Sequence, residues 1–192
     1  MRDVWQRIEN LLHNQAPDLL ARLAAGASPE AITKTEAKLG YQLPDEVRES
    51  YAIHDGSGNA GIFPQDDYGR INGVSLLSLE DATHESQSWT KLLNRNEFVG
   101  NTAHPTGPIK AEWWNRNWFP LTSNGGGDHL CIDMDPAPGG TIGQVIDFSH
   151  ESGPRAVLAP SWRAFLNNYV SDLEAGRLRF DDTGELASTT EE

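Results

Sequence analysis

A short stretch about two thirds of the way along the chain gathers side chains that bind metals and transfer protons. These are Asp128, His129, Cys131, Asp133 and Asp135. Alternate residues of a β-strand point to one face, about 7 Å apart for every two positions, so two neighbours from His129 onward could share a zinc ion. A closed zinc site needs four ligands, and the sequence has no second cluster of recognisable spacing to complete it. The pattern favours a half-buried strand that ends in a turn-forming Asp-Pro pair, and we predict neither a metal site nor a cofactor.

Two further motifs could take part in acid–base chemistry or phosphate binding. His54-Asp55-Gly56 pairs an imidazole with a carboxylate, and residues 125–127 are a run of three glycines. Acid–base catalysis on a nucleophile needs that nucleophile at an elbow or helix end, and the chain has neither a G-x-S-x-G nor a zincin helix motif. No Lys-Ser or Lys-Thr pair follows the glycines, and Asp128 would repel a phosphate. We interpret both motifs as turns and predict a protein without catalytic residues that is not an enzyme.

The formal net charge is -13, and its distribution is uneven. Residues 1–40 carry five acids and five bases, so the whole imbalance lies in residues 41–192, where 23 acids face ten bases. Such a surface repels nucleic acid and anionic lipid, and it attracts a basic protein and speeds its encounter. The alternative is that acidity only keeps the protein soluble. We predict a protein partner and no contact with nucleic acid or membrane.

Loops and a helix start in the middle of the chain offer acids for such a contact. The predicted partner-binding acids, chosen by charge and loop position, are Asp55, Asp66, Asp67, Glu80, Asp81 and Glu85. Trp113 and Trp114 complete the predicted site, because tryptophan is frequent at the energetic centre of interfaces. The two are adjacent and cannot both face the same way on a regular strand, so we expect at least one to be exposed. Both could instead be core residues that cover a sheet edge.

Hydrophobic periodicity and capping residues predict the helices that would position these side chains. The first forty residues have helical periodicity, and Ser28 followed by Pro-Glu marks a helix start. That helix stops at Gly40, which suits a left-handed C-terminal cap. Ser78 with Asp81 resembles a capping box at the start of a further helix. Ser161 caps the clearest amphipathic helix of the chain.

The middle and the second half of the chain predict short strands joined by turns. The expected strands are 61–63, 74–77, 118–121, 128–134, 142–148, 156–158 and 178–180, with a polar loop at 64–73 and an irregular stretch at 94–112. In the strand expected at 128–134, Leu130, Ile132 and Met134 share one face. Strand connections of two to nine residues favour antiparallel pairing. We therefore predict an α+β fold, with a central antiparallel sheet and helices packed around it.

Length and composition bound the organisation of the chain. Its 192 residues are 38% hydrophobic and suit one domain, which we place at 1–180, followed by an acidic, disordered tail at 181–192. No apolar run approaches the roughly 18 residues that cross a bilayer, and the N-terminus lacks the apolar stretch of a signal peptide. The single cysteine excludes an intrachain disulfide. We expect a cytoplasmic protein, and its oligomeric state is not indicated.

Several of these stretches line up, in order and spacing, with one known family. The matching segments are Leu39-Gly40, Leu43-Pro44 and His54-Asp55-Gly56, then Trp113-Trp114-Asn115 and Trp118-Phe119-Pro120-Leu121, then Asp133-Met134-Asp135-Pro136 and Gly143-Gln144-Val145-Ile146, and finally Leu-Ala-Pro-Ser-Trp at 158–162. In these segments the chain resembles the SUKH superfamily, specifically its Smi/Knr branch of cell-wall assembly regulators. The resemblance runs from about Trp5 to Phe180.

The resemblance implies an α+β domain with a central antiparallel sheet, and two kinds of role. Many bacterial members are immunity proteins that bind and block toxins, often nucleases, whereas fungal relatives regulate cell-wall synthesis through protein contacts. Fungal members usually carry long disordered extensions and this chain has only a short acidic tail, so the compact bacterial form is expected. We therefore predict an immunity protein that neutralises a basic, nuclease-type toxin, with a regulatory or scaffold protein as the alternative.

Overall fold

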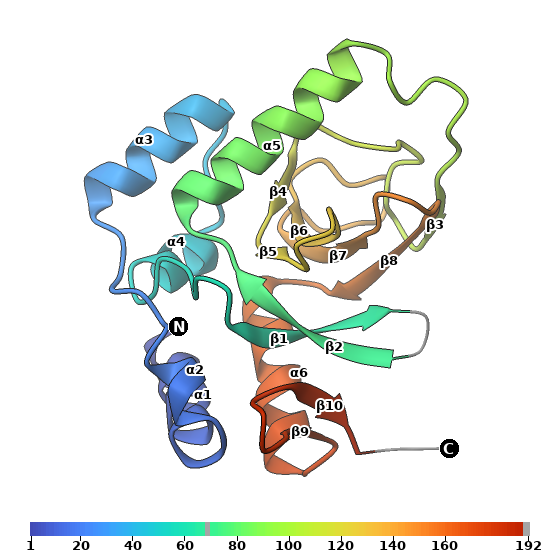
Figure 1. Ribbon diagram of the computed structural model, residues 1–192. Helices are drawn as coiled ribbons and strands as arrows, with labels where there is room; N and C mark the ends of the chain where they lie inside the picture. The colour runs from blue at the N-terminus through green and yellow to red at the C-terminus, as the bar shows by residue number, and fades with distance from the viewer. Residues whose placement is uncertain (68–69, 190–192) are drawn as a thin grey trace.

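The computed structural model describes residues 1–67 and 70–189 (Figure 1). The helices are α1 (Arg2–Gln15), α2 (Pro17–Leu20), α3 (Pro29–Leu39), α4 (Asp45–Tyr51), α5 (Leu79–Asn94) and α6 (Trp162–Glu174). The strands are β1 (Gly61–Asp67), β2 (Arg70–Leu76), β3 (His104–Thr106), β4 (Trp118–Pro120), β5 (Thr122–Ser123), β6 (His129–Asp133), β7 (Gln144–Phe148), β8 (Pro154–Ala159), β9 (Leu178–Phe180) and β10 (Leu186–Ser188).

Local signals set the ends of the long helices. Ser28, Ser78 and Ser161 each cap a helix, and each hydroxyl accepts a hydrogen bond from the backbone N–H three residues later at 3.1–3.2 Å. Gly40 ends α3 with φ 81°, a conformation in which a side chain is strained. The helix starts and the stop predicted from the sequence are therefore confirmed.

The strands form three sheets of mixed size. The largest has the order β3-β8-β7-β6-β4, and the others are β1-β2-β5 and β10-β9. In the described part of the chain the strand pairs are antiparallel except β3 with β8, which run parallel. The α+β class with helices around a largely antiparallel sheet is confirmed. The parallel pair was not expected, and it is allowed because four strands separate β3 from β8 in the sequence, a connection long enough for parallel pairing.

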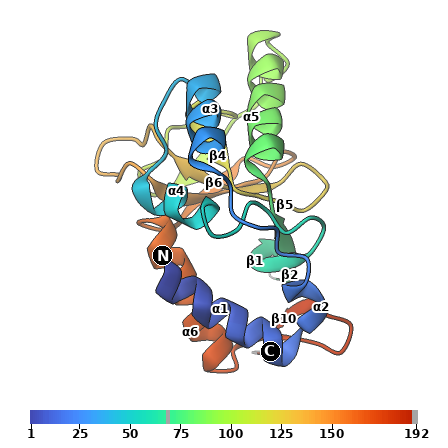
Figure 2. The same ribbon diagram turned by 90° about the vertical axis from the view of Figure 1, so that its left-hand side faces the viewer.

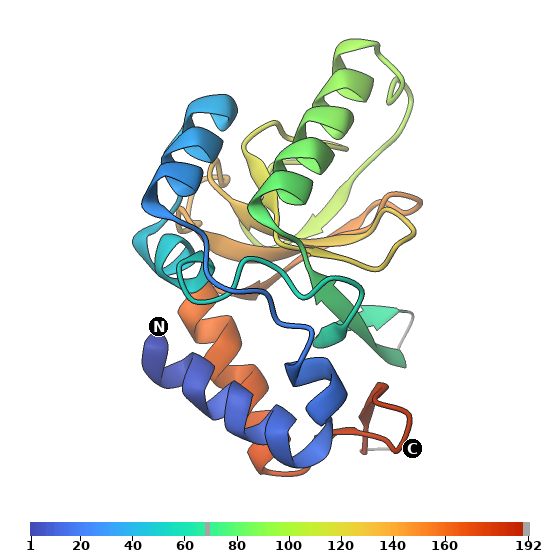
Figure 3. The same ribbon diagram turned by 60° about the vertical axis from the view of Figure 1, so that its left-hand side comes forward.

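The helices cover both faces of the large sheet. In Figures 1 and 3, α3 and α5 lie on one side of it, whereas α1, α6 and the β9–β10 hairpin lie on the other. Figure 2 shows α3 beside α5 and α1 beside α6, and both pairs are in contact. None of the described helices combines the length and apolar character needed to cross a membrane.

Two apolar cores lie on opposite faces of the large sheet. Leu130, Ile132 and Val145 pack into the main core, with α1, α4 and α6. The second core contains Cys131 and Phe148 from the other face, together with side chains of α5 and of the segment 109–118. Leu130 and Ile132 share a face with Met134, as the alternation predicted. Because both faces are covered, every residue of β6 is buried.

Two polar stretches are more regular than expected. The expected loop at 64–73 is largely strand, because β1 continues to Asp67 and β2 begins at Arg70. The expected disordered tail contains β10, which pairs with β9 and places Leu186, 3% exposed, in the main core. Both stretches are rich in polar residues, and their order comes from backbone pairing and from a few buried side chains that periodicity does not reveal.

Candidate functional site

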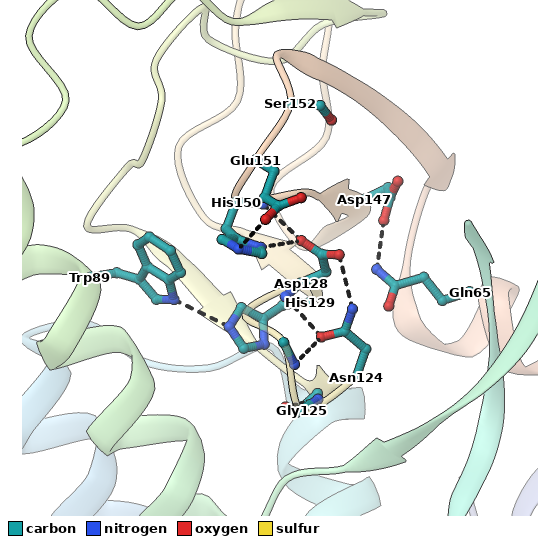
Figure 4. A network of polar contacts seen from close by, with 12 residues as sticks. Gln65, Trp89, Asn124, Gly125, Asp128, His129, Asp147, His150, Glu151 and Ser152 are labelled. Carbon is teal, nitrogen blue, oxygen red and sulfur yellow. Dashed lines mark hydrogen bonds and ion pairs between the residues drawn. The ribbon is translucent and has the colours of Figure 1, made fainter. Parts of the chain in front are cut away.

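A network of polar side chains lies at one end of the large sheet, beside the β1–β2 hairpin (Figure 4). Its members come from the β5–β6 turn, the start of β6, the end of β7 and residues 149–153, and they are joined by Trp89 of α5 and Gln65 of β1. The turn is the glycine run, in which Asn124 Oδ1 accepts the backbone N–H of Asp128 at 3.1 Å. Gly127 has φ 112°, and a Cβ there would lie 3.1 Å from the His150 ring. The predicted hairpin turn is therefore confirmed.

Asp128 anchors the loop that follows β7. Its Oδ1 accepts hydrogen bonds from the backbone N–H of His150 at 2.8 Å and from Nδ1 of His150 at 2.9 Å. Burial raises the pKa of Asp128, but hydrogen bonds from His150 and Asn124 outweigh burial, and the pKa is lowered overall. The next carboxylate, Glu151, is 77% exposed and lies 3.5 Å from Nε2 of His150. Asp128 therefore has a structural task, and Glu151 faces solvent.

His129 is held neutral inside the network. Its side chain is 1% exposed, its Nδ1 is 2.6 Å from the carbonyl oxygen of Thr122, and Trp89 Nε1 donates to its Nε2 at 3.2 Å. Since Nε2 accepts, Nδ1 carries the proton. Burial lowers the pKa of His129, although Glu85 lies 3.8 Å from Nε2. The imidazole fixes α5 to the sheet and has no free nitrogen for proton transfer.

A second polar contact ties the β1–β2 hairpin to β7. Gln65 Nε2 donates to Oδ1 of Asp147 at 2.9 Å. Burial raises the pKa of Asp147, and the nearby charges of Asp128 and Asp66 raise it further. Asp66 and Asp128, far apart in the sequence, therefore lie near the same half-buried carboxyl group.

The side chains that suggested metal chemistry have separate structural roles. Cys131 packs in the second core, and burial raises the pKa of its thiol. Asp133 accepts hydrogen bonds from Gln144 Nε2 at 2.9 Å and from the backbone N–H of Asp135 at 3.0 Å. Asp135 itself pairs with Lys110 at 2.6 Å. Within residues 1–67 and 70–189, no three His, Cys, Asp or Glu side chains are placed to hold a metal ion.

Asp55 stabilises the start of α5 and is not fully exposed at the surface. Its Oδ1 accepts the backbone N–H of Leu79, the first residue of α5, at 2.7 Å. Gly56 follows with φ 102°, so the interpretation of this motif as a turn is confirmed. Burial raises the pKa of Asp55, which the Leu79 hydrogen bond opposes and the charges of Asp81 and Glu80 reinforce. Asp55 therefore lies near the predicted acids of α5 but is half-buried beneath them.

The remaining predicted acids lie on the hairpin and on the first turns of α5. Glu80 and Asp81 are exposed, and Asp81 also accepts the Ser78 hydroxyl at 2.7 Å. Glu85 is 37% exposed. Asp66 is exposed in β1, whereas the side chain of Asp67, the last residue of that strand, lies outside the part of the chain that the structure describes.

Asp128 and Glu151, which were not among the predicted partner-binding acids, lie on loops close to those acids. Glu85 approaches His129, whose neighbour Asp128 binds the loop that carries Glu151. We call the combined set the acidic surface: Asp66, Glu80, Asp81, Glu85, Asp128 and Glu151. The signal for the missed pair was an acid just before one strand and an acid just after the next, since Asp128 precedes β6 and Glu151 follows β7. That cross-strand position becomes evident only once β6 and β7 are paired.

The two predicted tryptophans have different surroundings. Trp114 is 1% exposed and stacks on Trp89 in the second core, so its ring does not lie at the surface of this fold. Its burial gives no support to its place in the predicted partner-binding site, which stays a prediction. Trp113 is partly exposed and lies against the guanidinium of Arg155, 5.2 Å from the ring centroid. Arg155, itself buried, also donates to the Trp113 carbonyl oxygen at 3.2 Å. The core alternative holds for Trp114, and Trp113 remains available at the surface.

Comparison with known proteins gives a consistent set of relatives. The chain matches the family described as SMI1 / KNR4 family (SUKH-1) over residues 26–168. It is 29% identical over 190 residues to "Cell wall biosynthesis/cell cycle regulator smi1" of Schizosaccharomyces pombe. That alignment covers 93% of this chain and 37% of the relative. The "Glucan synthesis regulatory protein" of Neurospora crassa is 28% identical over 218 residues, covering 95% of this chain and 40% of the relative.

A third relative carries a similar name. "Cell wall assembly regulator SMI1" of Saccharomyces cerevisiae is 25% identical over 210 residues, covering 90% of this chain and 40% of the relative. The chain thus spans about two fifths of the length of the curated relatives it matches.

Proposed function

Since the chain belongs to the SMI1/KNR4 family (SUKH-1), we propose that it is a non-catalytic, protein-binding domain of the cell-wall regulator type. One observation carries the proposal: 90–95% of the chain aligns with proteins whose names describe regulation of cell-wall or glucan synthesis. Regulation of this kind requires contact with other proteins. The domain would supply one such contact surface.

The polar network supports a binding role over a chemical one. Its buried groups bond to their own chain: Asp128 to His150, His129 to Thr122 and Trp89, and Asp147 to Gln65. Groups engaged in this way hold loops in place and are poor candidates for proton transfer to a substrate. Their effect is to fix the positions of the exposed carboxylates around them.

The acidic surface is our candidate for the contact. Glu80, Asp81, Glu85 and Glu151 are exposed or half-exposed, in a chain of net charge -13. A field of one sign steers an oppositely charged partner into place and raises the association rate. We therefore propose that the partner presents a basic surface.

The toxin-neutralising function expected from the sequence remains a prediction. The regulators named above support the alternative of that expectation better than its main form. An immunity protein and a regulator would both use a protein-binding surface, so the shape of the domain does not separate them. The identity of the partner does.

Affinity capture from extract of the native cell tests the proposal. Tagged chain should retain proteins of cell-wall synthesis or signalling, and the double variant Glu80→Lys/Glu85→Lys should retain markedly less of them. The matched control is Asp18→Lys/Asp182→Lys, which makes the same charge change at exposed positions outside the acidic surface. Retention of a toxin domain would instead support the immunity function. If neither class of protein is retained above the level of an untagged control, the proposed function is wrong.

A further inference from the structure

A basic groove interrupts the otherwise acidic chain. It encloses about 420 Å³ and is lined by the C-terminal parts of α3 and α5 and by the segment 116–117. Four exposed basic side chains line it: Lys38, Lys91, Arg95 and Arg116. Among the described residues that line this groove, none is acidic. A chain with 28 acids and 15 bases thus gathers four of its bases in one place.

The basic side chains of this groove lack the carboxylate partners that several other bases of the chain have. Arg7, Arg163 and Arg177 each pair with a carboxylate at 2.6–3.2 Å. Over the described part of the chain, by contrast, no carboxylate lies within ion-pair distance of a basic side chain of the groove, and Arg116 reaches only the Asn94 amide oxygen, at 3.5 Å. The positive charge of the groove is therefore not neutralised by its own walls.

Helix dipoles explain only part of this arrangement. Lys38 and Lys91 lie in the last turns of α3 and α5, where a cation stabilises the negative end of a helix. Each helix end contributes about half a negative charge, so two ends offset about one of four positive charges. Arg116 belongs to no helix. The groove therefore remains electropositive after this effect is counted.

The walls of the groove are fixed before any partner arrives. Trp89 and Leu93 of α5 pack in the second core, and Trp114 Nε1 donates to Thr90 Oγ1 at 3.3 Å, which joins α5 to the segment that carries Arg116. Uncharged hydrogen-bonding side chains form the rest of the lining, with Leu39 as an apolar contact: Ser86, Gln87, Thr90, Asn94 and Asn117. A preformed site of this kind pays little ordering cost on binding.

We infer that the basic groove binds an acidic, extended segment of a partner protein. Charge complementarity selects glutamate- or aspartate-rich chain, and the polar lining offers bonds to its backbone. Nucleic acid is disfavoured because the molecule as a whole is strongly negative. The inference rests on the proposed function only in taking the occupant to be a protein, and it makes no use of the acidic surface.

Fluorescence anisotropy with the full chain tests the inference. The probe is a labelled peptide that alternates glutamate with serine, and its counterpart has glutamine in place of glutamate. We expect the glutamate peptide to bind at least tenfold more tightly at low ionic strength, and to weaken as salt rises. At the same low ionic strength, Lys91→Glu/Arg95→Glu should bind the glutamate peptide about tenfold more weakly than the wild type does, because two attractive contacts become repulsive. Arg2→Glu/Arg179→Glu alters net charge equally, at exposed positions outside the groove, and should change affinity less than about twofold.

Three outcomes would overturn the inference. They are equal affinity for the two peptides, equal loss in the two variants, and tighter binding of a single-stranded RNA than of the glutamate peptide. Circular dichroism of each variant checks that the fold is intact. Because the assay uses only purified chain and peptide, its result is separate from affinity capture: capture can fail while the peptide binds, and the reverse.

Discussion

The two ends of α5 carry opposite charge and serve different surfaces. Glu80, Asp81 and Glu85 lie in its first two turns and belong to the acidic surface, whereas Lys91 and the capping residue Arg95 line the basic groove. This order agrees with the helix dipole, which favours acids at the start and bases at the end. Net charge, summed over the chain, conceals the second region entirely. A protein of charge -13 can still present a local site for acids.

The two regions are also held in different ways. The acidic surface depends on hydrogen bonds, since Asp128 and His150 fix the loop that carries Glu151. The basic groove depends on apolar packing, because the second core under α5 fixes its walls. Perturbing the core should therefore disturb the groove first, and changing pH should disturb the acidic surface first.

Removal of the Trp114 side chain, which supports the basic groove, should cause the largest loss of stability. Trp114 is buried against Trp89, so Trp114→Ala should lower the free energy of unfolding by about 3–5 kcal/mol and loosen the wall that carries Arg116. Trp113→Ala, at a partly exposed ring, should cost about 1–2 kcal/mol, including the loss of its contact with Arg155. Urea denaturation followed by circular dichroism measures both. Equal costs would contradict the placement of the two rings.

Acidification should act through His129. Burial lowers its folded-state pKa, so below the usual value of about 6.5 the unfolded chain binds a proton that the folded chain does not. This contribution to stability is therefore present at neutral pH and falls as pH decreases, by at most about 1.4 kcal/mol per pH unit. His129→Gln keeps one donor and one acceptor for Thr122 and Trp89 and should remove this slope.

The carboxyl groups of Asp147 and Asp133 contribute a pH dependence of the opposite sign. Burial raises the pKa of Asp147 and of Asp133, so their linkage favours the folded state as pH falls toward ordinary carboxyl values. The difference in urea midpoints between the wild type and His129→Gln, followed from neutral pH to about pH 5.5, therefore isolates the contribution of His129. A slope that is identical in the wild type and in His129→Gln would contradict a neutral, buried imidazole.

Charge reversal on the acidic surface should affect association more than stability. Glu80→Lys/Glu85→Lys should slow the association of a basic peptide several-fold at low salt, and the difference should shrink as salt screens the field. Stopped-flow fluorescence gives the rate, with Asp18→Lys/Asp182→Lys as the control of equal charge. A rate that salt does not change would remove steering from the account.

The smallest effect is expected for a neutral substitution in the basic groove. Arg95 is exposed and has no carboxylate partner among the described residues, so Arg95→Gln should change the free energy of unfolding by less than about 0.5 kcal/mol. Urea denaturation at low salt is the measurement. A loss above about 1 kcal/mol would show that Arg95 is needed for the fold. Arg95 would then not differ from a base that is paired with a carboxylate, such as Arg177.

Local signals in the sequence were enough to predict the helices and the fold class. Serine caps and the glycine stop at Gly40 act through bonds within one turn, so they can be read directly. The strand at β10 was not predictable, because a single buried leucine, Leu186, carries no periodicity. The resemblance identified the family from scattered segments, and the regulator alternative fits the relatives better than the immunity function.

The site was only partly predictable for a similar reason. Glu80, Asp81 and Glu85 are near in sequence and remain near in space, whereas Asp128 and Glu151 join them through the pairing of β6 with β7. The groove is lined by Lys38, Lys91 and Arg116, which come from three distant segments of the sequence. No local sequence pattern indicates that these three side chains lie close together. Burial of Trp114 likewise depends on packing against α5, which adjacency to Trp113 cannot reveal.

A reciprocal binding test addresses the central claim most directly. Wild type, the acidic-surface variant Glu80→Lys/Glu85→Lys and the groove variant Lys91→Glu/Arg95→Glu are each titrated with a glutamate–serine peptide and with a lysine–serine peptide. The account predicts that the groove variant loses only the glutamate peptide and that the acidic-surface variant weakens only the lysine peptide. If each variant instead shifts both peptides as its net charge alone dictates, the chain has one diffuse field and not two separate binding regions.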